Sequence, residues 1–276
     1  MLVILDGKKI SEEIVEELLA QESRLSAIPT LGVLMGAEDA ASASFVKIKE
    51  RVAEKLHVPM MRELLGVHAT TADALGALER LVHTCTGVIV QMPLPPQINL
   101  ADVLAALPPL KDVDAITDTQ TMLRAPVAEA VSEILARTNV TARGKVAVVV
   151  GAGKLVGAPV AELLRELGAD VLVVTHNEGS LASLKDADIV VLGAGEPGLI
   201  KPEMLKEGVV LIDAGTSEKI RGVATDSVAT PRIAGDADPT CAEVASVFTP
   251  VPGGIGPIAV AMIFKNLFTL AKLPKN

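Results

Sequence analysis

The segment VAVVVGAGKLVGAPVAELL, residues 146–164, joins a five-residue apolar run, a glycine-rich turn and a helical pattern. Gly151, Gly153 and Gly157 have the spacing GxGxxxG. The first glycine permits a tight turn, the second lets a pyrophosphate approach the backbone, and the helix N-terminus offers unpaired N–H groups. Because the glycines follow a strand and open a helix, the context favours a dinucleotide-binding loop over a purely structural turn.

The rest of the second half continues this alternation of strand and helix. After a helical pattern at Val156–Leu167, apolar runs predict strands at Val171–Thr175, Ala187–Leu192 and Val209–Asp213. Such alternation predicts a parallel sheet with helices on both faces. A more broken, proline-containing stretch over residues 108–145 precedes this half, and we place a domain junction there.

The first half has its own helices and strands. Apolar residues at helical spacing predict helices over residues 9–24 and 42–56, and apolar runs predict strands over residues 30–35 and Gly87–Gln91. Gly87–Gln91 is apolar on both faces, which is typical of a buried parallel strand. With a last amphipathic helix over residues 257–273, the pattern indicates an α/β protein of two domains.

Composition narrows the class of protein. Half of the 276 residues are apolar, which is enough for a sizeable core, and a formal net charge of −9 argues against nucleic-acid and anionic-membrane partners. The start lacks a signal-peptide pattern and no apolar run is long enough for a membrane span, so we expect a cytoplasmic protein. Cys85 and Cys241 lack metal-ligand spacing and are expected to be reduced.

An acidic residue follows the second strand of the glycine-loop half. Glu178 lies a little further from Gly151 than the usual spacing of about 20 residues. A carboxylate there can accept hydrogen bonds from the adenosine ribose hydroxyls, and it would repel a 2′-phosphate and so favour NAD over NADP. An exposed loop carboxylate without a ligand is the alternative, and the sequence leaves both open.

Three polar residues of the first half have candidate chemical roles. Lys49 shares a helical face with Phe45 and Val52. A desolvated lysine has a lowered pKa and can act as an acid or base near neutral pH, although periodicity alone favours a snorkelling surface lysine. Gln91 ends a buried strand, where ligands of parallel sheets bind, unless it is a satisfied loop amide. Asp114, in KDVDAI, completes the trio, with a helix cap or a salt bridge as its alternatives.

Six motifs occur in order along nearly the whole chain: DGKKI, ASASFVKIK, VIVQMPLP, KDVDAI, GAGKLVGAP and TPVPGGIGP. Together they resemble the bifunctional methylenetetrahydrofolate dehydrogenase/methenyltetrahydrofolate cyclohydrolase family, with QMPLP and PVPGGIGP as the specific matches. The resemblance implies an N-terminal α/β folate-site domain of residues 1–118 plus 256–276 and a C-terminal Rossmann-like parallel-sheet domain of residues 119–255. The C-terminal helix would return to the first domain, and the protein would be a homodimer.

The resemblance also implies an activity and residue roles. The family oxidises 5,10-methylenetetrahydrofolate with NAD(P), without a metal, and hydrolyses the methenyl product to 10-formyltetrahydrofolate. Lys49 matches the lysine that assists proton transfer, Gln91 its partner, and Asp114 the residue that binds the pterin. The remaining matches line the folate pocket, at Phe45, Pro252, Gly253 and Gly254, or the cofactor loops, at Gly151, Gly153, Lys154, Val156, Gly157, His176, Glu178 and Gly193.

Several positions depart from the family pattern. Phe45 replaces the usual tyrosine, and it can stack on a ring but cannot donate a hydrogen bond. Residues 125–128 read APVA instead of PCTP, and Ala259 replaces a threonine. Ala152-Gly153 replaces an Arg-Ser pair and His176-Asn177-Glu178 replaces His-Ser-Lys, which removes contacts suited to the 2′-phosphate. The family default is NADP, and this sequence leans to NAD.

The leading hypothesis is therefore an enzyme with both folate activities. Phe45 motivates a second hypothesis, a dehydrogenase with weak or lost cyclohydrolase activity. The lost polar contacts motivate a third, a non-catalytic binding paralogue, against which the retention of Lys49, Gln91 and Asp114 argues. A dehydrogenase of another small metabolite would leave QMPLP and PVPGGIGP unexplained.

Overall fold

The computed structural model describes residues 2–36, 40–117, 122–219 and 232–273, without the side chains of residues 40–45, 218, 219 and 232. The chain forms two compact units. We call Met1–Ile10 with Val127–Ala259 the large-sheet unit, and Ser11–Pro126 with Val260–Asn276 the small-sheet unit.

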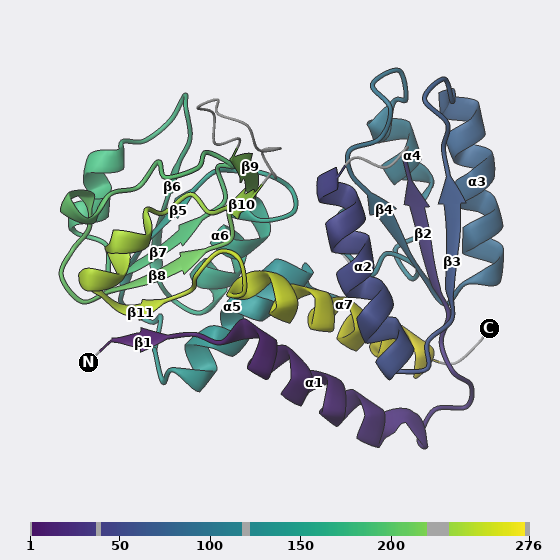
Figure 1. Ribbon diagram of the computed structural model, residues 1–276, viewed down its shortest axis with the longest axis horizontal. Helices are drawn as coiled ribbons and strands as arrows, with labels where there is room; N and C mark the ends of the chain where they lie inside the picture. Colours follow the sequence, from purple (N-terminus) through teal and green to yellow (C-terminus); the bar gives the residue numbers. More distant parts are fainter. Residues whose placement is uncertain (1, 37–39, 118–121, 220–231, 274–276) are drawn as a thin grey trace, which may run out of the picture. The chain divides into compact units, whose positions relative to one another are not determined.

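The large-sheet unit contains a parallel six-stranded sheet of order β1-β11-β8-β7-β5-β6 (Figure 1). β6 and β7 lie on opposite sides of β5, so the strand order reverses at β5, and such switch points are where parallel sheets bind ligands. The strands are β1 (Val3–Ile4), β5 (Val146–Val150), β6 (Asp170–Val174), β7 (Ile189–Leu192), β8 (Val209–Asp213) and β11 (Ala245–Phe248).

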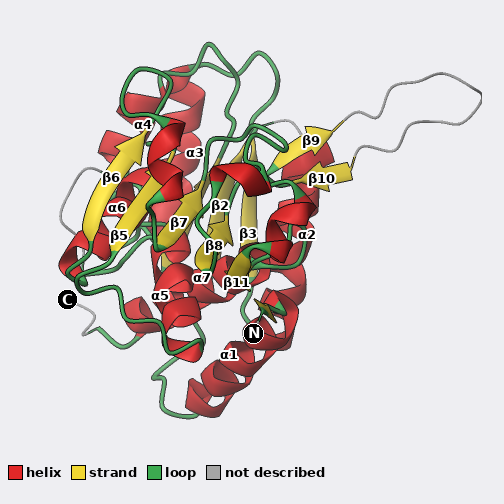
Figure 2. Cartoon of the chain, turned by 90° about the vertical axis from the view of Figure 1, so that its left-hand side faces the viewer, coloured by secondary structure: helices red, strands yellow, loops and turns green. Residues whose placement is uncertain are grey.

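The carboxyl ends of four of these strands are in register. Val150 pairs with Val174 on one side and Leu192 on the other, and Leu192 pairs with Asp213. Figure 2 shows β6, β5, β7 and β8 following one another across the sheet. The loops after these strands therefore emerge along one edge.

Both faces of the large sheet are buried. Val148, Val190 and Leu211 belong to a core cluster on one face, and the alternating neighbours Val149 and Val191 are fully buried on the other. Near-continuous apolar strands are the signature of a parallel sheet covered twice. The remaining elements are α5 (Pro126–Arg137), α6 (Gly157–Glu166), η1 (Leu181–Lys185), η2 (Pro202–Met204), η3 (Pro239–Glu243) and the antiparallel pair β9 (Ser217–Lys219) and β10 (Arg232–Ala234).

The small-sheet unit contains a parallel three-stranded sheet of order β3-β2-β4, formed by β3 (Met60–Leu64), β2 (Leu31–Met35) and β4 (Gly87–Gln91). Val88 and Val90 of β4 pack in one core cluster with residues of α3 (Thr71–Thr84) and α4 (Leu100–Ala106). Because side chains alternate along a strand, Gly87, Ile89 and Gln91 face the opposite side. That side is covered by α2 (Ala40–Lys55) and by the last part of α7 (Ile255–Ala271).

The fold predicted from the sequence is confirmed: two α/β units, a parallel sheet with helices on both faces, and a final helix whose residues 260–271 join the small-sheet unit. Residues 2–10 cluster with the large-sheet unit, because β1 pairs with β11. α1 (Gly7–Glu22) begins in that unit and continues into the other. Within the described ranges, no helix is long and apolar enough to cross a membrane.

Candidate active site

Lys49 lies on the buried face of α2. Val46, Val52 and Ala53 of the same helix are buried, and Lys49 itself is only 6% exposed. Its Nζ donates a hydrogen bond of 2.6 Å to Oε1 of Gln91. Burial lowers the pKa of Lys49, and the attraction of Asp114 opposes this shift. The side chain is thus desolvated, unlike that of the exposed Lys47.

Gln91 is the last residue of β4, opposite Met35 of β2. Its Nε2 donates to the carbonyl of Met92 at 3.0 Å, which fixes the orientation of the amide. Because the amide nitrogen is used there, the oxygen faces the amino group of Lys49. The end of a buried strand and the turn behind it therefore hold the acceptor for the lysine.

Asp114 follows a short segment that lies beside β4. Val88 and Asp112 form a parallel bridge, and Asn266 of α7 donates to the carbonyl of Val113 at 2.9 Å. Asp114 is buried, and burial raises its pKa to about 6 against the opposing effect of Lys49, while the charge of Asp112 adds to the rise. Burial thus raises the pKa of Asp114 and lowers that of Lys49, and each shift favours the uncharged form of the side chain.

Two residues of this region were missed in the sequence analysis. Asp112 is fully buried, and its Oδ2 accepts a hydrogen bond from the N–H of Thr117 at 2.9 Å, whereas Oδ1 has no partner among the described residues. Asn266 is a buried amide that also donates to the carbonyl of Arg124. The available signals were an aspartate two positions before Asp114 and a lone amide in an apolar helix.

The structure brings together three of the glycines predicted to bind the cofactor. Gly151 has φ +102°, and a Cβ atom there would lie 2.4 Å from the carbonyl oxygen of Gly193. A Cβ at Gly157 would lie 2.0 Å from the Gly151 oxygen, and one at Gly193 would lie 2.5 Å from a methyl group of Val156. These glycines let the turn after β5 pack directly on the loop after β7.

Gly153 differs from these three glycines. Nothing lies within 4 Å of the position that its Cβ would occupy, so packing does not require a glycine there. α6 begins just beyond it with Val156 as its N-cap and with no side-chain cap. An open backbone next to an uncapped helix N-terminus is the arrangement that a pyrophosphate group fits. Lys154, predicted to line the same loop, is exposed.

His176 and Glu178 lie in the loop after β6. Nε2 of His176 is 2.9 Å from Oε1 of Glu196, which follows β7. Glu178 is exposed, and its backbone N–H donates to Oγ1 of Thr175 at 3.1 Å. The backbone of this loop is therefore held by Thr175, and the Glu178 carboxylate is accessible to a ligand.

The residues predicted to line the folate pocket are positioned differently from the lysine trio. Gly253, with φ +102°, accepts a hydrogen bond from the N–H of Gly7 at 2.9 Å, and Gly254 donates to the carbonyl of Pro250 at 2.7 Å. Pro252 is exposed beside them. These three residues belong to the large-sheet unit, whereas Lys49, Gln91 and Asp114 belong to the small-sheet unit. The backbone of Phe45 is in α2, and its side chain lies outside the described residues.

Comparison with known proteins identifies the family. The family model described as tetrahydrofolate dehydrogenase/cyclohydrolase, catalytic domain, matches residues 5–114, and the NAD(P)-binding domain of the same family matches residues 125–275. The bifunctional protein FolD of Staphylococcus epidermidis is 36% identical, over 99% of this chain and 98% of its own. A Trypanosoma brucei methylenetetrahydrofolate dehydrogenase-cyclohydrolase, solved with NADP and an inhibitor, has a TM-score of 0.90 and 31% identity, with 98% of this chain and 97% of that chain covered.

A methylenetetrahydrofolate dehydrogenase of the silkworm, Bombyx mori, has a TM-score of 0.86 and 31% identity, with 99% of this chain and 98% of that chain covered. The match therefore extends over both units and confirms the resemblance that the motifs indicated. The chain belongs to the tetrahydrofolate dehydrogenase/cyclohydrolase family.

Proposed function

We propose that this protein oxidises 5,10-methylenetetrahydrofolate to 5,10-methenyltetrahydrofolate with NAD(P) and hydrolyses that product to 10-formyltetrahydrofolate. The buried contact between Lys49 and Gln91, next to the buried acid Asp114, carries the proposal. A lysine with a lowered pKa is uncommon in a purely structural position and is suited to proton transfer near neutral pH. A relative that matches over 99% of this chain is named as bifunctional.

The hydrolysis requires a group that can take and return a proton. Water forms a C–O bond to the methenyl carbon and the bond from that carbon to N5 breaks. Water loses two protons in total, of which one ends on N5 and one is released. Desolvation increases the fraction of Lys49 that is neutral, so its amine can accept the first proton, and the Gln91 oxygen holds that amine in one direction.

Asp114 is proposed to bind the pterin. With a pKa of about 6, the carboxyl is largely ionised at neutral pH and can accept hydrogen bonds from an amino group and a ring N–H. Phe45, Pro252, Gly253 and Gly254 remain proposed pocket residues. On this assignment the small-sheet unit supplies the proton chemistry.

The cofactor residues fit a dinucleotide. The open backbone at Gly153 and the uncapped start of α6 offer space and N–H groups to a pyrophosphate. NAD(P), when bound, supplies the hydride acceptor. We further propose that the coenzyme is NAD, because Glu178 is exposed where the second strand of the nucleotide fold ends.

Other finer assignments come from the motif resemblance and composition. We propose a cytoplasmic homodimer that acts on a folate and has no nucleic-acid partner, in keeping with its formal net charge of −9. The domain limits 1–118 plus 256–276 and 119–255 likewise remain a functional proposal.

Spectrophotometric assays test the proposed function. Oxidation of methylenetetrahydrofolate is followed with NAD and NADP in parallel, and hydrolysis of methenyltetrahydrofolate is followed without a nucleotide. We expect both reactions, with a lower KM for NAD. Loss of hydrolysis alone would support a monofunctional dehydrogenase, absence of both would reject the proposal, and a lower KM for NADP would reject the role of Glu178. Glu178→Gln should narrow the difference between the two coenzymes, whereas Glu207→Gln, also exposed but before β8, should not.

A further inference from the structure

Two buried aspartates at the carboxyl edge of the large sheet have no role in the chemistry described above. Asp213 is the last residue of β8 and is 1% exposed, and Asp236 follows β10 and is fully buried. Burying a carboxylate is costly unless hydrogen bonds replace its lost hydration. Their partners therefore indicate what the two residues do.

Asp236 accepts three backbone hydrogen bonds from one loop. The donors are the N–H groups of Ala194 at 2.7 Å, Gly195 at 3.1 Å and Glu196 at 2.7 Å. These residues directly follow β7 and Gly193, so one carboxylate gathers the N–H groups of three successive residues. Hydrogen bonds to a charged acceptor contribute more to stability than hydrogen bonds between neutral groups.

Asp213 supports Asp236 in turn. Its Oδ1 accepts from the N–H groups of Gly215 at 2.9 Å and Asp236 at 3.2 Å, and its Oδ2 accepts from Ala237 at 2.8 Å. A Cβ at Gly215 would lie 2.1 Å from the carboxyl carbon of Asp236, and one at Gly235 would lie 2.2 Å from Oδ2 of Asp213. Each carboxylate thus lies directly against the backbone of a glycine. This close contact leaves the carboxylate little room to move.

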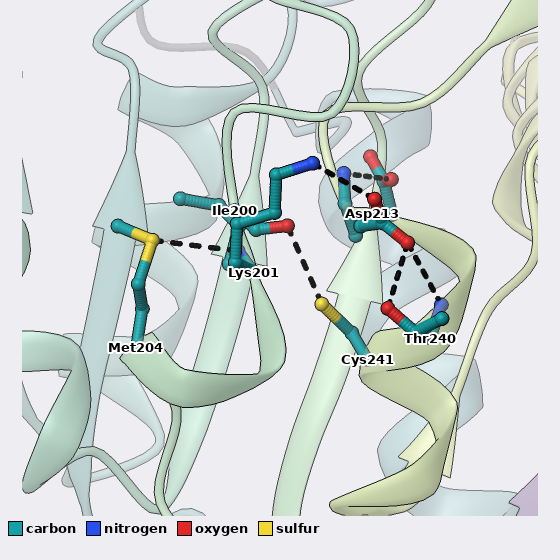
Figure 3. A network of polar contacts seen from close by, with 8 residues as sticks. Ile200, Lys201, Met204, Asp213, Thr240 and Cys241 are labelled. Carbon is teal, nitrogen blue, oxygen red and sulfur yellow. Dashed lines mark hydrogen bonds and ion pairs between the residues drawn. The ribbon is translucent and has the colours of Figure 1, made fainter.

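The segment that carries Asp236 is anchored on its other side as well. Ile200 donates its N–H to the Asp236 carbonyl at 2.9 Å, and Lys201 forms an ion pair of 2.8 Å with Asp238. The thiol of Cys241 donates to the Ile200 carbonyl at 3.4 Å (Figure 3). Asp236 is therefore a fixed point from which the loop after β7 is held.

The loop after β7 contacts both parts of the proposed dinucleotide site, which are the glycine turn after β5 and the loop after β6. The carbonyl of Gly193 and the N–H of Ala194 pack closely against Gly151 of the glycine turn, and Glu196 pairs with His176 in the loop after β6. We propose that Asp236, held by Asp213, is a positioning residue for dinucleotide binding. Its carboxylate presets the loop at residues 194–196, so that less conformational entropy is lost when NAD(P) binds. The inference rests on the proposed function of this unit.

Asp236→Asn tests the inference. The amide keeps the shape but replaces one acceptor oxygen with a donor that faces backbone N–H groups. Titration with NAD and NADP should show a dissociation constant raised about tenfold or more, equivalent to about 1.4 kcal/mol. The KM for the dinucleotide should rise likewise, whereas the KM for the folate and nucleotide-free hydrolysis should change less than about twofold. A purely structural role would lower both activities together.

Two further variants keep the test decisive. Ser217→Ala removes the hydrogen bond of 2.6 Å from its Oγ to the Gly195 carbonyl on the exposed side of the same loop, and should raise the dissociation constant about two- to threefold without impairing folding. Asp188→Asn is the matched control, since Asp188 accepts the N–H of Val146 at the amino edge of the same sheet. It should leave dinucleotide affinity unchanged even where stability falls.

The outcomes separate this inference from the proposed function. If the unaltered protein binds neither NAD nor NADP, the proposed function of the unit fails. If it binds but Asp236→Asn binds equally well, or loses hydrolysis in parallel, only the positioning role fails. Should Asp236→Asn not fold, unchanged affinity in Ser217→Ala would overturn the inference and weakened affinity would support it.

Discussion

The two units give their buried charged groups different partners, although burial also raises the pKa of Asp213, to about 6, against the backbone hydrogen bonds that it accepts. In the small-sheet unit, Lys49 and Asp114 are buried close enough to influence each other, and burial shifts both pKa values toward the neutral forms. In the large-sheet unit, Asp213 and Asp236 each accept three backbone N–H groups. The first arrangement leaves side chains able to exchange protons, and the second uses side chains to hold the backbone.

The difference matches what each site is proposed to do. Proton transfer needs groups whose charged and neutral forms are close in free energy, and burial with few partners provides this. A pyrophosphate is bound by backbone N–H groups and by close approach to glycine. The role of Asp213 and Asp236 is therefore to hold the backbone in position, without touching the ligand themselves. We therefore expect substitutions in the small-sheet unit to act on chemistry, and those in the large-sheet unit to act on affinity and stability.

The largest expected effect is that of Lys49→Met, which keeps the length and apolar contacts of the side chain but removes the amine. Because general acid–base groups contribute about 10²–10⁴-fold, hydrolysis should fall by at least about a hundredfold. Stability should be retained or raised, since a buried amine is lost. Lys47→Met, exposed on the same helix, is the control and should hydrolyse normally. Unchanged turnover in Lys49→Met would remove Lys49 from the mechanism.

Gly151→Ala and Gly153→Ala test the large-sheet unit, where we expect effects on stability and on dinucleotide affinity. At Gly151 a methyl group meets the Gly193 carbonyl at 2.4 Å with φ +102°, so unfolding free energy should fall by about 3 kcal/mol. At Gly153 the methyl group meets nothing within 4 Å, so stability should change by less than about 1 kcal/mol. Dinucleotide affinity should nevertheless fall in Gly153→Ala. Denaturant titration and dinucleotide titration measure the two quantities, and equal affinity for Gly153→Ala and the parent would contradict the proposed pyrophosphate site.

Asp114→Asn reveals, through the pH dependence of the unfolding free energy, what it costs to bury the charged carboxylate. The folded-state pKa of about 6 lies above the ordinary value of 3.8, so the folded state retains a proton that the unfolded state has lost. The stability that this proton contributes is complete below about pH 4, declines as pH rises to about 6, and is absent above it. Asp114→Asn should therefore be more stable than the parent at pH 7 by up to about 3 kcal/mol, and the difference should disappear near pH 4.

The control for this pH series is Asp73, whose contribution to stability has the opposite pH dependence. A cap interaction with Thr70 lowers the pKa of the exposed Asp73, so its contribution is present at neutral pH and lost in acid. Asp73→Asn should be less stable than the parent at pH 7. Thermal unfolding over the pH range measures both variants, and a destabilised Asp114→Asn at pH 7 would show that Lys49 offsets the burial of the acid.

Where side chains alone determine an element, the sequence predicts it well. The predicted strands Gly87–Gln91, Val146–Val150 and Val209–Asp213 have the observed limits, because each is a short apolar run that must be buried on both faces. β3 was missed, since Met60–Leu64 is an edge strand with Arg62 and Glu63 and lacks an apolar pattern. α3 was also missed, although its capping box of Thr70 and Asp73 was a readable signal.

The site was less readable than the fold. Periodicity placed Lys49 on an apolar face but could not distinguish a buried amine from a snorkelling one, because the covering strand comes from residues 87–91. Asp213 lies two residues before a glycine, in DAG, and Asp236 lies directly after one, in GDAD, and such sequences are typical of ordinary turns. Their partners lie 40 to 42 positions away in one case and 2 to 24 in the other, so only the folded chain reveals them.

The smallest expected effect concerns Ala115, which follows Asp114 with φ +48°. An L-residue with a Cβ atom loses about 1–2 kcal/mol in this left-handed region, and glycine avoids that cost. Because glycine also makes the unfolded chain more flexible, by about 0.4–1 kcal/mol, Ala115→Gly should raise unfolding free energy by about 0.5 kcal/mol. Ala115→Val, with a branched Cβ, should lower it by more than about 1 kcal/mol.

Denaturant titration of the two Ala115 variants measures whether the unfolding free energy rises or falls, and the folate KM shows whether the backbone strain orients Asp114. A raised KM in the more stable Ala115→Gly would mean that backbone strain helps to orient the acid, which would extend the contrast between the two units from their side chains to their backbone.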